Sequence, residues 1–203
     1  MASLPCRIRR NSHSMKANRM KGLFTIGYEN ATLVDFIATL HAARVTLLLD
    51  VREFPLSRKK GFSKRALSEA VQAAGIAYRH ERDLGSPKTL RQQLHSDGDY
   101  AQFFSSFSKY LKLQAPLLAE LAADLEGKVA LMCFERDPAT CHRSIVAKQL
   151  ESLVDLKTKH LGVVHGADKN RTRAGSGEGV SAVSSSPSSI SMWLGQVASQ
   201  ENP

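Results

Sequence analysis

The amino-acid sequence predicts a single α/β domain with a mainly parallel sheet of four to five strands and helices on both faces. Short runs of Val, Leu and Ile alternate along the chain with longer amphipathic segments, the pattern of repeated strand–helix–strand units. Two of these runs, residues 45–50 and 129–133, are almost entirely apolar, as strands covered on both faces are. The chain has 203 residues and is 42% hydrophobic and 23% charged, which suits one globular domain with a sizeable core.

The strands are expected, in order, at residues 23–26, 45–50, 76–80, 129–133 and 156–161. Helices are expected at residues 32–43, 63–74, 116–125 and 142–153, with a longer helical region over residues 90–111. Thr32 followed by Asp35 is a capping box for the first helix, and Gly75 supplies the left-handed residue that ends the second. Apolar residues at helical spacing are expected in the core: Leu90, Leu94, Phe103, Phe107 and Leu111.

The domain is expected to cover residues 22–162, with an extension at each end. Residues 1–21 form a basic leader and residues 163–203 a Ser- and Gly-rich tail. Both lack the apolar side chains that would offset the entropy of ordering them, so we expect both to be disordered. Residues 1–19 hold five basic and no acidic residues, more than half of the net charge of +9. The basic balance of the whole chain is therefore a weak argument for nucleic-acid binding.

The composition also indicates the cellular compartment in which the protein is expected. No apolar run approaches the roughly 18 residues of a membrane span, and no apolar segment follows the basic N-terminus as it does in a secretory signal. The three cysteines are too few for a disulfide scaffold and indicate a reducing environment. These observations predict a cytoplasmic protein without a membrane partner.

Several short motifs occur in a fixed order along the domain. They are Thr25-Ile-Gly-Tyr28, Asp50-Val-Arg52 with Pro55 and Ser57-Arg58, Gly61-Phe62, Gly75-Ile-Ala-Tyr78, Leu84-Gly85, Cys133-Phe-Glu135 and Cys141-His142-Arg143. As an ordered set they resemble the bacterial and archaeal family known as domain of unknown function 488. The resemblance spans about residues 23–161, with Thr158 where the family usually has Val. It implies an α/β fold and does not imply a particular reaction.

A first polar cluster follows the strand at residues 45–50. Asp50 and Arg52 are two residues apart, so their side chains are expected on one face. Arg52 and Arg58 offer planar guanidinium groups to a phosphate or carboxylate, with Ser57 as a further donor and Asp50 orienting an arginine. Five cations within residues 57–65 support this interpretation. The alternatives are a purely structural ion pair and a solvated basic loop. Tyr28, after the first strand, could stack on a ring or close the core.

A second polar cluster follows the strand at residues 129–133. Glu135 could act as a general base, hold a cation together with Asp50, or pair with an arginine. Cys141, His142 and Arg143 are expected in the first turn of a helix, where free amides favour an anion. The helix start and Arg143 are expected to lower the pKa of Cys141, which makes it a candidate nucleophile or redox thiol. The alternative is a small residue packed at a helix cap.

Histidines and possible cofactors complete the candidate site. His80 and His160 each end a strand and could meet at one edge for proton transfer, or could serve structure alone. The sequence requires no cofactor, although a divalent metal remains possible. Zinc on Cys133, Cys141 and His142 is conceivable, but the spacing is not a standard zinc knuckle, so no metal ligand is assigned. Neither a dinucleotide fingerprint nor a Walker loop is present.

The leading hypothesis is a protein that binds a phosphorylated or other anionic ligand, a nucleotide or nucleic acid, at the carboxyl edge of the sheet, where open α/β folds bind ligands. It would hydrolyse or transfer part of that ligand, as a hydrolase or transferase. Candidate catalytic residues are Asp50, Glu135, His80 and Cys141. Candidate substrate-binding residues are Tyr28, Arg52, Ser57, Arg58, His142 and Arg143. The alternatives are a non-enzymatic nucleic-acid-binding or regulatory protein, and a redox switch that uses Cys133 and Cys141.

Overall fold

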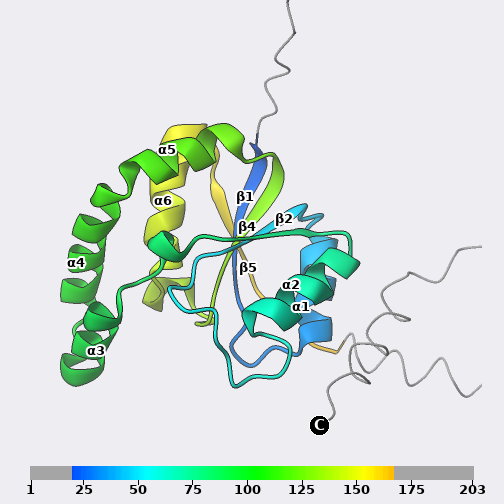
Figure 1. The fold of residues 1–203 in the computed structure, drawn as a ribbon, viewed down its shortest axis with the longest axis horizontal. Coiled ribbons are helices and arrows are strands. Elements are labelled where there is room, and N and C mark those ends of the chain that lie inside the picture. Colours follow the sequence, from blue (N-terminus) through cyan, green and yellow to red (C-terminus); the bar gives the residue numbers. More distant parts are fainter. Residues whose placement is uncertain (1–19, 167–203) are drawn as a thin grey trace, which may run out of the picture.

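The computed structural model describes residues 20–166, which form a five-stranded, all-parallel sheet between two layers of helices (Figure 1). The strands are β1 (Met20–Gly27), β2 (Leu47–Asp50), β3 (Ala77–His80), β4 (Gly127–Cys133) and β5 (Thr158–Leu161). Their order across the sheet is β3-β2-β4-β1-β5. The predicted α/β class, parallel sheet and helices on both faces are confirmed.

Each face of the sheet carries its own apolar core. Helices α1 (Leu33–Ala42) and α2 (Lys64–Ala73) cover one face, and α4 (Tyr100–Leu113), α5 (Ala115–Asp124) and α6 (Arg143–Val154) cover the other (Figure 1). Successive strand residues alternate between the two cores, so Leu48 packs toward α1 and α2 whereas Leu49 packs toward α4 to α6. Burial on both faces explains why the central strands contain so few polar residues.

Helix boundaries follow the local signals that the sequence contains. The Thr32 hydroxyl accepts a hydrogen bond from the Asp35 amide at 3.1 Å, so the expected cap of α1 is confirmed. Ser63 precedes α2 but its side chain makes no cap hydrogen bond; its hydroxyl donates to the Ser57 carbonyl at 3.1 Å. Gly75 has φ of +76°, the left-handed conformation expected after α2.

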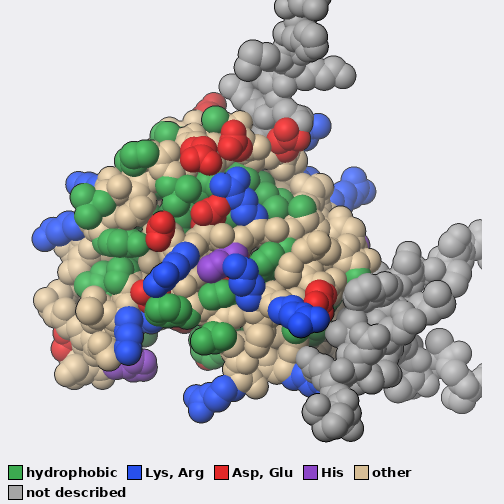
Figure 2. All heavy atoms as spheres, in the orientation of Figure 1, with side chains coloured by type: hydrophobic (Ala, Val, Ile, Leu, Met, Phe, Trp, Pro, Cys, Tyr) green, Lys and Arg blue, Asp and Glu red, His purple; other side chains and the backbone are tan. Residues whose placement is uncertain are grey.

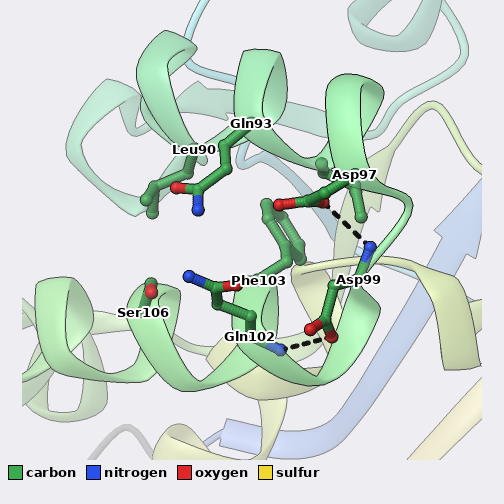
Figure 3. A pocket seen from close by; sticks show the side chains of 8 residues that line it. Leu90, Gln93, Asp97, Asp99, Gln102, Phe103 and Ser106 are labelled. Atoms are coloured by element: carbon green, nitrogen blue, oxygen red, sulfur yellow. Dashed lines mark hydrogen bonds between the residues drawn. The ribbon is translucent and has the colours of Figure 1, made fainter.

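The long helical region is a hairpin of two helices, α3 (Lys88–Asp97) and α4, at one side of the molecule (Figure 1). Figure 3 shows the turn between them, where the Asp97 carboxylate accepts from the Asp99 amide and the Asp99 carboxylate from the Gln102 amide, both at 2.9 Å. The crevice between the helices holds only about 10 Å³, room for a single water. Phe103, Phe107 and Leu111 are buried as expected. Two further expected core residues on α3 are only partly buried: Leu90 and Leu94.

The described chain extends beyond both expected limits of the domain. β1 begins at Met20, and residues 163–166 continue along α1 after β5. There the Val164 amide donates to the Thr39 hydroxyl and the Gly166 amide to the Asp35 carboxylate, both at 3.0 Å. The remainder of the predicted leader and tail, residues 1–19 and 167–203, lies outside the described residues. Within residues 20–166, no helix combines the length and the apolar character that a membrane crossing requires.

Candidate functional site

A cleft of about 460 Å³ opens at the carboxyl edge of the sheet. Its walls come from the segments that follow β1, β2 and β4, together with the first residue before α6 and one residue of α3. Six of the sequence-predicted site residues line it: Tyr28, Arg52, Ser57, Arg58, Glu135 and His142. Asp50, His80, Cys141 and Arg143 are not among the lining residues.

Asp50 and Arg52 form a buried ion pair beneath one side of this cleft. Arg52 Nε and Nη2 donate to the two carboxylate oxygens of Asp50 at 2.8 and 2.6 Å. Arg52 Nη1 donates to the Tyr28 hydroxyl at 3.0 Å and to the Phe62 carbonyl at 2.9 Å. The Tyr78 hydroxyl donates to Asp50 at 2.7 Å. Four of the five N–H groups of Arg52 are therefore committed to the protein, which supports the structural alternative for this pair.

Burial and charge set the protonation of this network. Burial alone would lower the pKa of Arg52, but the hydrogen bonds and charge of Asp50 outweigh it, so the pKa is raised and the guanidinium stays charged. Burial, with the nearby Asp50 carboxylate, raises the pKa of Tyr78 above its usual range. Tyr78 therefore remains a hydrogen-bond donor to Asp50. Tyr28 stacks on Phe62 with ring centroids 4.4 Å apart and is 3% exposed, so it closes the core while its edge borders the cleft.

Arg143 is a clamp on the backbone rather than an exposed anion ligand. It is 1% exposed, and its Nη1 and Nη2 donate to the carbonyls of Glu135 and Arg136 at 2.5 and 3.1 Å. The same turn lies against the end of β1, because a Cβ placed on Gly27 would stand 1.8 Å from the Glu135 carbonyl oxygen. The expectation that Arg143 faces a bound anion at the helix start is wrong. The reason is that, although Arg143 is the first residue of α6 as expected, its guanidinium is committed to the carbonyls of the preceding loop.

Four polar side chains after β4 converge on one point. The Glu135 carboxylate accepts from the thiols of Cys133 and Cys141 at 3.1 and 2.9 Å. His142 Nδ1 lies 3.7 Å from the sulfur of Cys133 and 3.9 Å from that of Cys141. On the other side of the ring, Nε2 lies 2.9 Å from the Val51 carbonyl, to which it donates because a carbonyl only accepts. We call Cys133, Glu135, Cys141 and His142 the Cys-Glu-His cluster.

The protonation states within the cluster differ from the sequence-based expectation. Burial raises the pKa of Cys141 well above its usual value, and Cys133 raises it further, so the expected lowering is wrong. Cys141 lies before α6 and not in its first turn, which removes most of the expected help from the helix. Burial pushes the pKa of Glu135 upward, but the two thiol hydrogen bonds outweigh it and the pKa is lowered. Burial would lower the pKa of His142, but Cys141, the Val51 carbonyl and Glu135 raise it.

Asp50 and Glu135 do not share a site, although their strands β2 and β4 are neighbours. Asp50 continues the alternation of Leu48 and points toward α1 and α2, whereas Cys133 continues that of Leu131 and points toward α6. Glu135 joins the Cys133 side. A cation shared by Asp50 and Glu135 is therefore a wrong expectation: of this buried ion pair, Arg52 lines the cleft with Glu135 and Asp50 does not.

The rim of the cleft carries cations and exposed rings. Ser57, Arg58 and Lys59 line it from the loop after β2, and the Lys59 amide donates to the Ser57 hydroxyl at 3.1 Å. Within residues 20–166, neither Arg58 nor Lys59 has a carboxylate partner. Phe54 and Phe134 are 46% and 45% exposed. Figure 2 shows Lys and Arg side chains spread over the middle and lower part of one face, with acidic side chains gathered at its upper end over α5.

The two strand-end histidines lie far apart. β3 and β5 are the opposite edges of the sheet, with three strands between them, so the expected meeting of His80 and His160 is wrong. His80 Nε2 lies 2.8 Å from the Arg52 carbonyl, and His160 Nδ1 lies 2.7 Å from the Thr25 hydroxyl. His80 thus holds the backbone after β2 and lies outside the cleft lining.

Sequence reasoning missed several residues of the cleft: Glu53, Phe54, Leu56, Arg91 and Phe134. Phe134 directly follows Cys133 and Phe54 lies two residues after Arg52, so a search for large apolar residues near polar strand ends would have found both. Arg91 reaches the cleft from α3, and its Nη2 lies 2.8 Å from Glu53 Oε2. No signal near residue 91 indicates this, because it depends on how the helical hairpin packs.

Comparison with known families agrees with this architecture. Residues 32–150 match the family model described as domain of unknown function DUF488, so the chain belongs to that family. No curated protein and no solved structure matched the chain. The predicted family is confirmed, and the matched segment runs from the cap of α1 into α6, which includes both polar clusters.

Proposed function

We propose that the protein binds an anionic ligand that carries a planar ring, in the simplest case a nucleotide, in the cleft at the carboxyl edge of the sheet. The observation that carries the proposal is that half-exposed rings and cations without a carboxylate partner within residues 20–166 share one rim: Phe54, over whose ring Arg82 lies, and Phe134, with Arg58 and Lys59. Aromatic rings stack on a base, and cations bind phosphate. The cleft volume of about 460 Å³ falls within the range of small-molecule sites.

The anion would be held by Arg58, and not also by Arg52 and Arg143 as the sequence predicts. Arg52 and Arg143 are 6% and 1% exposed and are bonded to the protein, so they set the shape of the cleft. Arg58 is exposed and lines the cleft, which leaves its planar donors available to a phosphate. Glu53 and Glu135 are the carboxylates that line the cleft, and hydrolysis or transfer of part of the ligand would fall to Glu135, because Glu53 is paired with Arg91.

The test is isothermal titration of the full chain with AMP, adenosine and inorganic phosphate. We expect AMP to bind more tightly than either part, because it engages both the rings and the cations. The double substitution R58Q/K59Q should weaken AMP binding about tenfold or more, since one charge-assisted hydrogen bond contributes about 1.5–3 kcal/mol. The matched control is K64Q/R65Q, which removes the same charge from residues that do not line the cleft. Equal losses of AMP affinity in both variants, or no binding of AMP to the wild type at about 1 mM, would contradict the proposal.

A non-enzymatic nucleic-acid-binding function is the second candidate. The observation that favours it is a run of exposed cations after β2: Arg58, Lys60, Lys64 and Arg65. A single-stranded oligonucleotide that tracks this run would lose affinity in K64Q/R65Q as well as in R58Q/K59Q, with a steep salt dependence. Binding of AMP that responds only to R58Q/K59Q would favour the small-molecule function instead.

A further inference from the structure

We propose that the Cys-Glu-His cluster is a zinc site, with Cys133, Cys141, His142 and Glu135 as its ligands. The proposal goes beyond the binding of an anionic ligand and does not depend on it. Two thiolates, one imidazole and one carboxylate are donors that zinc accepts in tetrahedral sites. Two soft sulfur ligands disfavour Mg²⁺ and Ca²⁺, which take oxygen ligands.

The distances within the cluster approach those of a tetrahedron around one ion. One ligand atom from each of the four residues lies within 4.8 Å of every other. Zinc–sulfur bonds of about 2.3 Å and zinc–nitrogen bonds of about 2.0–2.1 Å place sulfur and nitrogen about 3.6 Å apart. The sulfurs of Cys133 and Cys141 stand 3.7 and 3.9 Å from His142 Nδ1. Their distances to the Glu135 carboxylate are 3.1 and 2.9 Å, so that carboxylate has to retreat from the sulfurs by about half an ångström.

The orientation of His142 is an independent observation that points to a metal. Its Nε2 donates to the Val51 carbonyl at 2.9 Å, so the proton of the neutral ring is on Nε2. The lone pair of Nδ1 then faces the two sulfurs. Histidine ligands of metals characteristically donate their second N–H to a backbone carbonyl or a carboxylate, which fixes the ring. Phe107 packs edge-on against the same ring at 5.2 Å and holds it further.

The surrounding chain holds the four residues in place before any ion binds. Cys133 is the last residue of β4, and the carbonyl of Glu135 is held by Arg143. Zinc with two thiolates and a carboxylate has a formal charge of −1, and the buried Arg143 guanidinium carries +1 beside it. Binding would release the two thiol protons to solvent, as for other thiolate sites.

The site would lie at the floor of the cleft. Cys133, Glu135 and His142 line the cleft, whereas Cys141 lies behind them at 1% exposure. Glu135 also lines a second, open cleft of about 660 Å³ on the side of β5. A ligand in either cleft could therefore reach the ion by displacing Glu135, which would leave Cys133, Cys141 and His142 as protein ligands.

The test uses the full chain, reduced with a phosphine and stripped with a chelator before the metal is added. We expect one zinc per chain after dialysis, and a cobalt-substituted protein with the visible bands of a tetrahedral ion and a strong near-ultraviolet thiolate band. C133S and C141S should each weaken zinc binding more than about 100-fold, because a direct ligand contributes more than an outer-shell partner. The third cysteine supplies the control, and C6S should bind zinc as the wild type does.

The cobalt spectrum of the wild type decides the proposal even if a cysteine variant fails to fold. A reduced wild-type chain that retains no zinc, or an octahedral cobalt spectrum without a thiolate band, would overturn it. A disulfide between Cys133 and Cys141 that persists under the reducing conditions would also overturn it, in favour of the redox switch. None of these results depends on AMP, so failure of the zinc site and failure of the proposed function can be told apart.

Discussion

The buried pair of Asp50 and Arg52 yields the sharpest prediction about stability. Asp50→Asn keeps the shape of the side chain and removes its charge. Asp50 is fully buried and accepts hydrogen bonds from the Arg52 backbone amide, Nε and Nη2 and from the Tyr78 hydroxyl. In the variant the Arg52 charge would stay buried without a counter-charge, and the new amide would point donors toward a guanidinium that has only donors.

The expected loss is large relative to the whole stability of a domain. Removing one partner of a buried ion pair costs about 3–5 kcal/mol, out of about 5–15 kcal/mol for unfolding a typical domain. With an m-value of about 2 kcal/mol per molar urea, the unfolding midpoint should fall by about 1.5–2.5 M. Urea unfolding followed by circular dichroism measures this shift.

The matched control is Glu69→Gln, which breaks an ion pair with Arg65 on the surface. Its N···O distance is 2.8 Å, close to those of the buried pair, but the side chains of Arg65 and Glu69 are 91% and 51% exposed. Exposed pairs of this kind contribute about 0.5 kcal/mol or less, so the midpoint should hardly move. Equal shifts for Asp50→Asn and Glu69→Gln would refute the structural role assigned to Asp50 and Arg52.

Three further substitutions test other parts of the account. Gly27→Ala should lower the free energy of unfolding by about 3 kcal/mol or more, because the new Cβ would stand 1.8 Å from a backbone oxygen. The control is Gly162→Ala, whose Cβ would have nothing within 4 Å and which should change the free energy of unfolding by less than about 0.5 kcal/mol. Comparable melting temperatures for the two variants would contradict this prediction. Arg143→Met should cost about 2–4 kcal/mol in urea unfolding, because two partly buried carbonyls lose the donor that the buried guanidinium provides. A loss below about 0.5 kcal/mol would show that the clamp is dispensable. Glu151 accepts a hydrogen bond from the Thr158 amide at 2.6 Å, which lowers the pKa of Glu151 below the ordinary 4.5. A carboxylate whose pKa is lowered on folding stabilises the fold above the unfolded pKa, and this stabilisation is lost as pH falls through the folded pKa. Glu151→Gln should therefore lower the melting temperature slightly at about pH 7, and this difference should shrink as the pH falls below the ordinary pKa of Glu151. A difference that grows toward acid would have the wrong sign.

The fold could be predicted because its signals are local. The apolar runs of β2 and β4, the Thr32 cap and the left-handed Gly75 each act within a few residues. Alternation of strands and helices then restricts the topology to a parallel sheet. The burial of α3 was less predictable, because Leu90 and Leu94 face a helical hairpin at the margin and not the sheet.

The site was predictable only in position. Both polar clusters follow adjacent strands at the carboxyl edge, as the sequence predicts. The face of the sheet on which each side chain lies depends on the exact register, because a shift of one residue along a strand moves every side chain to the opposite face. This is why Asp50 and Glu135 were expected together and lie apart. Whether an arginine is free to bind a ligand depends on long-range partners, such as the Phe62 carbonyl for Arg52, which sequence spacing does not reveal.

The Cys-Glu-His cluster is likewise not evident from the sequence. Its ligands span residues 133–142 with spacings that match no standard knuckle. A short 3-10 turn over Pro138–Thr140 brings Cys141 back toward Cys133, and the outer partner of His142 comes from Val51, some ninety residues away. The convergence is a property of the folded chain.

We expect the exposed rim, and not the buried arginines, to hold the ligand in the carboxyl-edge cleft. A crystal structure of the reduced, zinc-supplemented chain with AMP tests this most directly. We expect the phosphate beside Arg58 and Lys59, the base against Phe54 or Phe134, and Arg52 and Arg143 still bonded to the protein. A phosphate held by Arg52 or Arg143, or AMP bound outside this cleft, would contradict the claim.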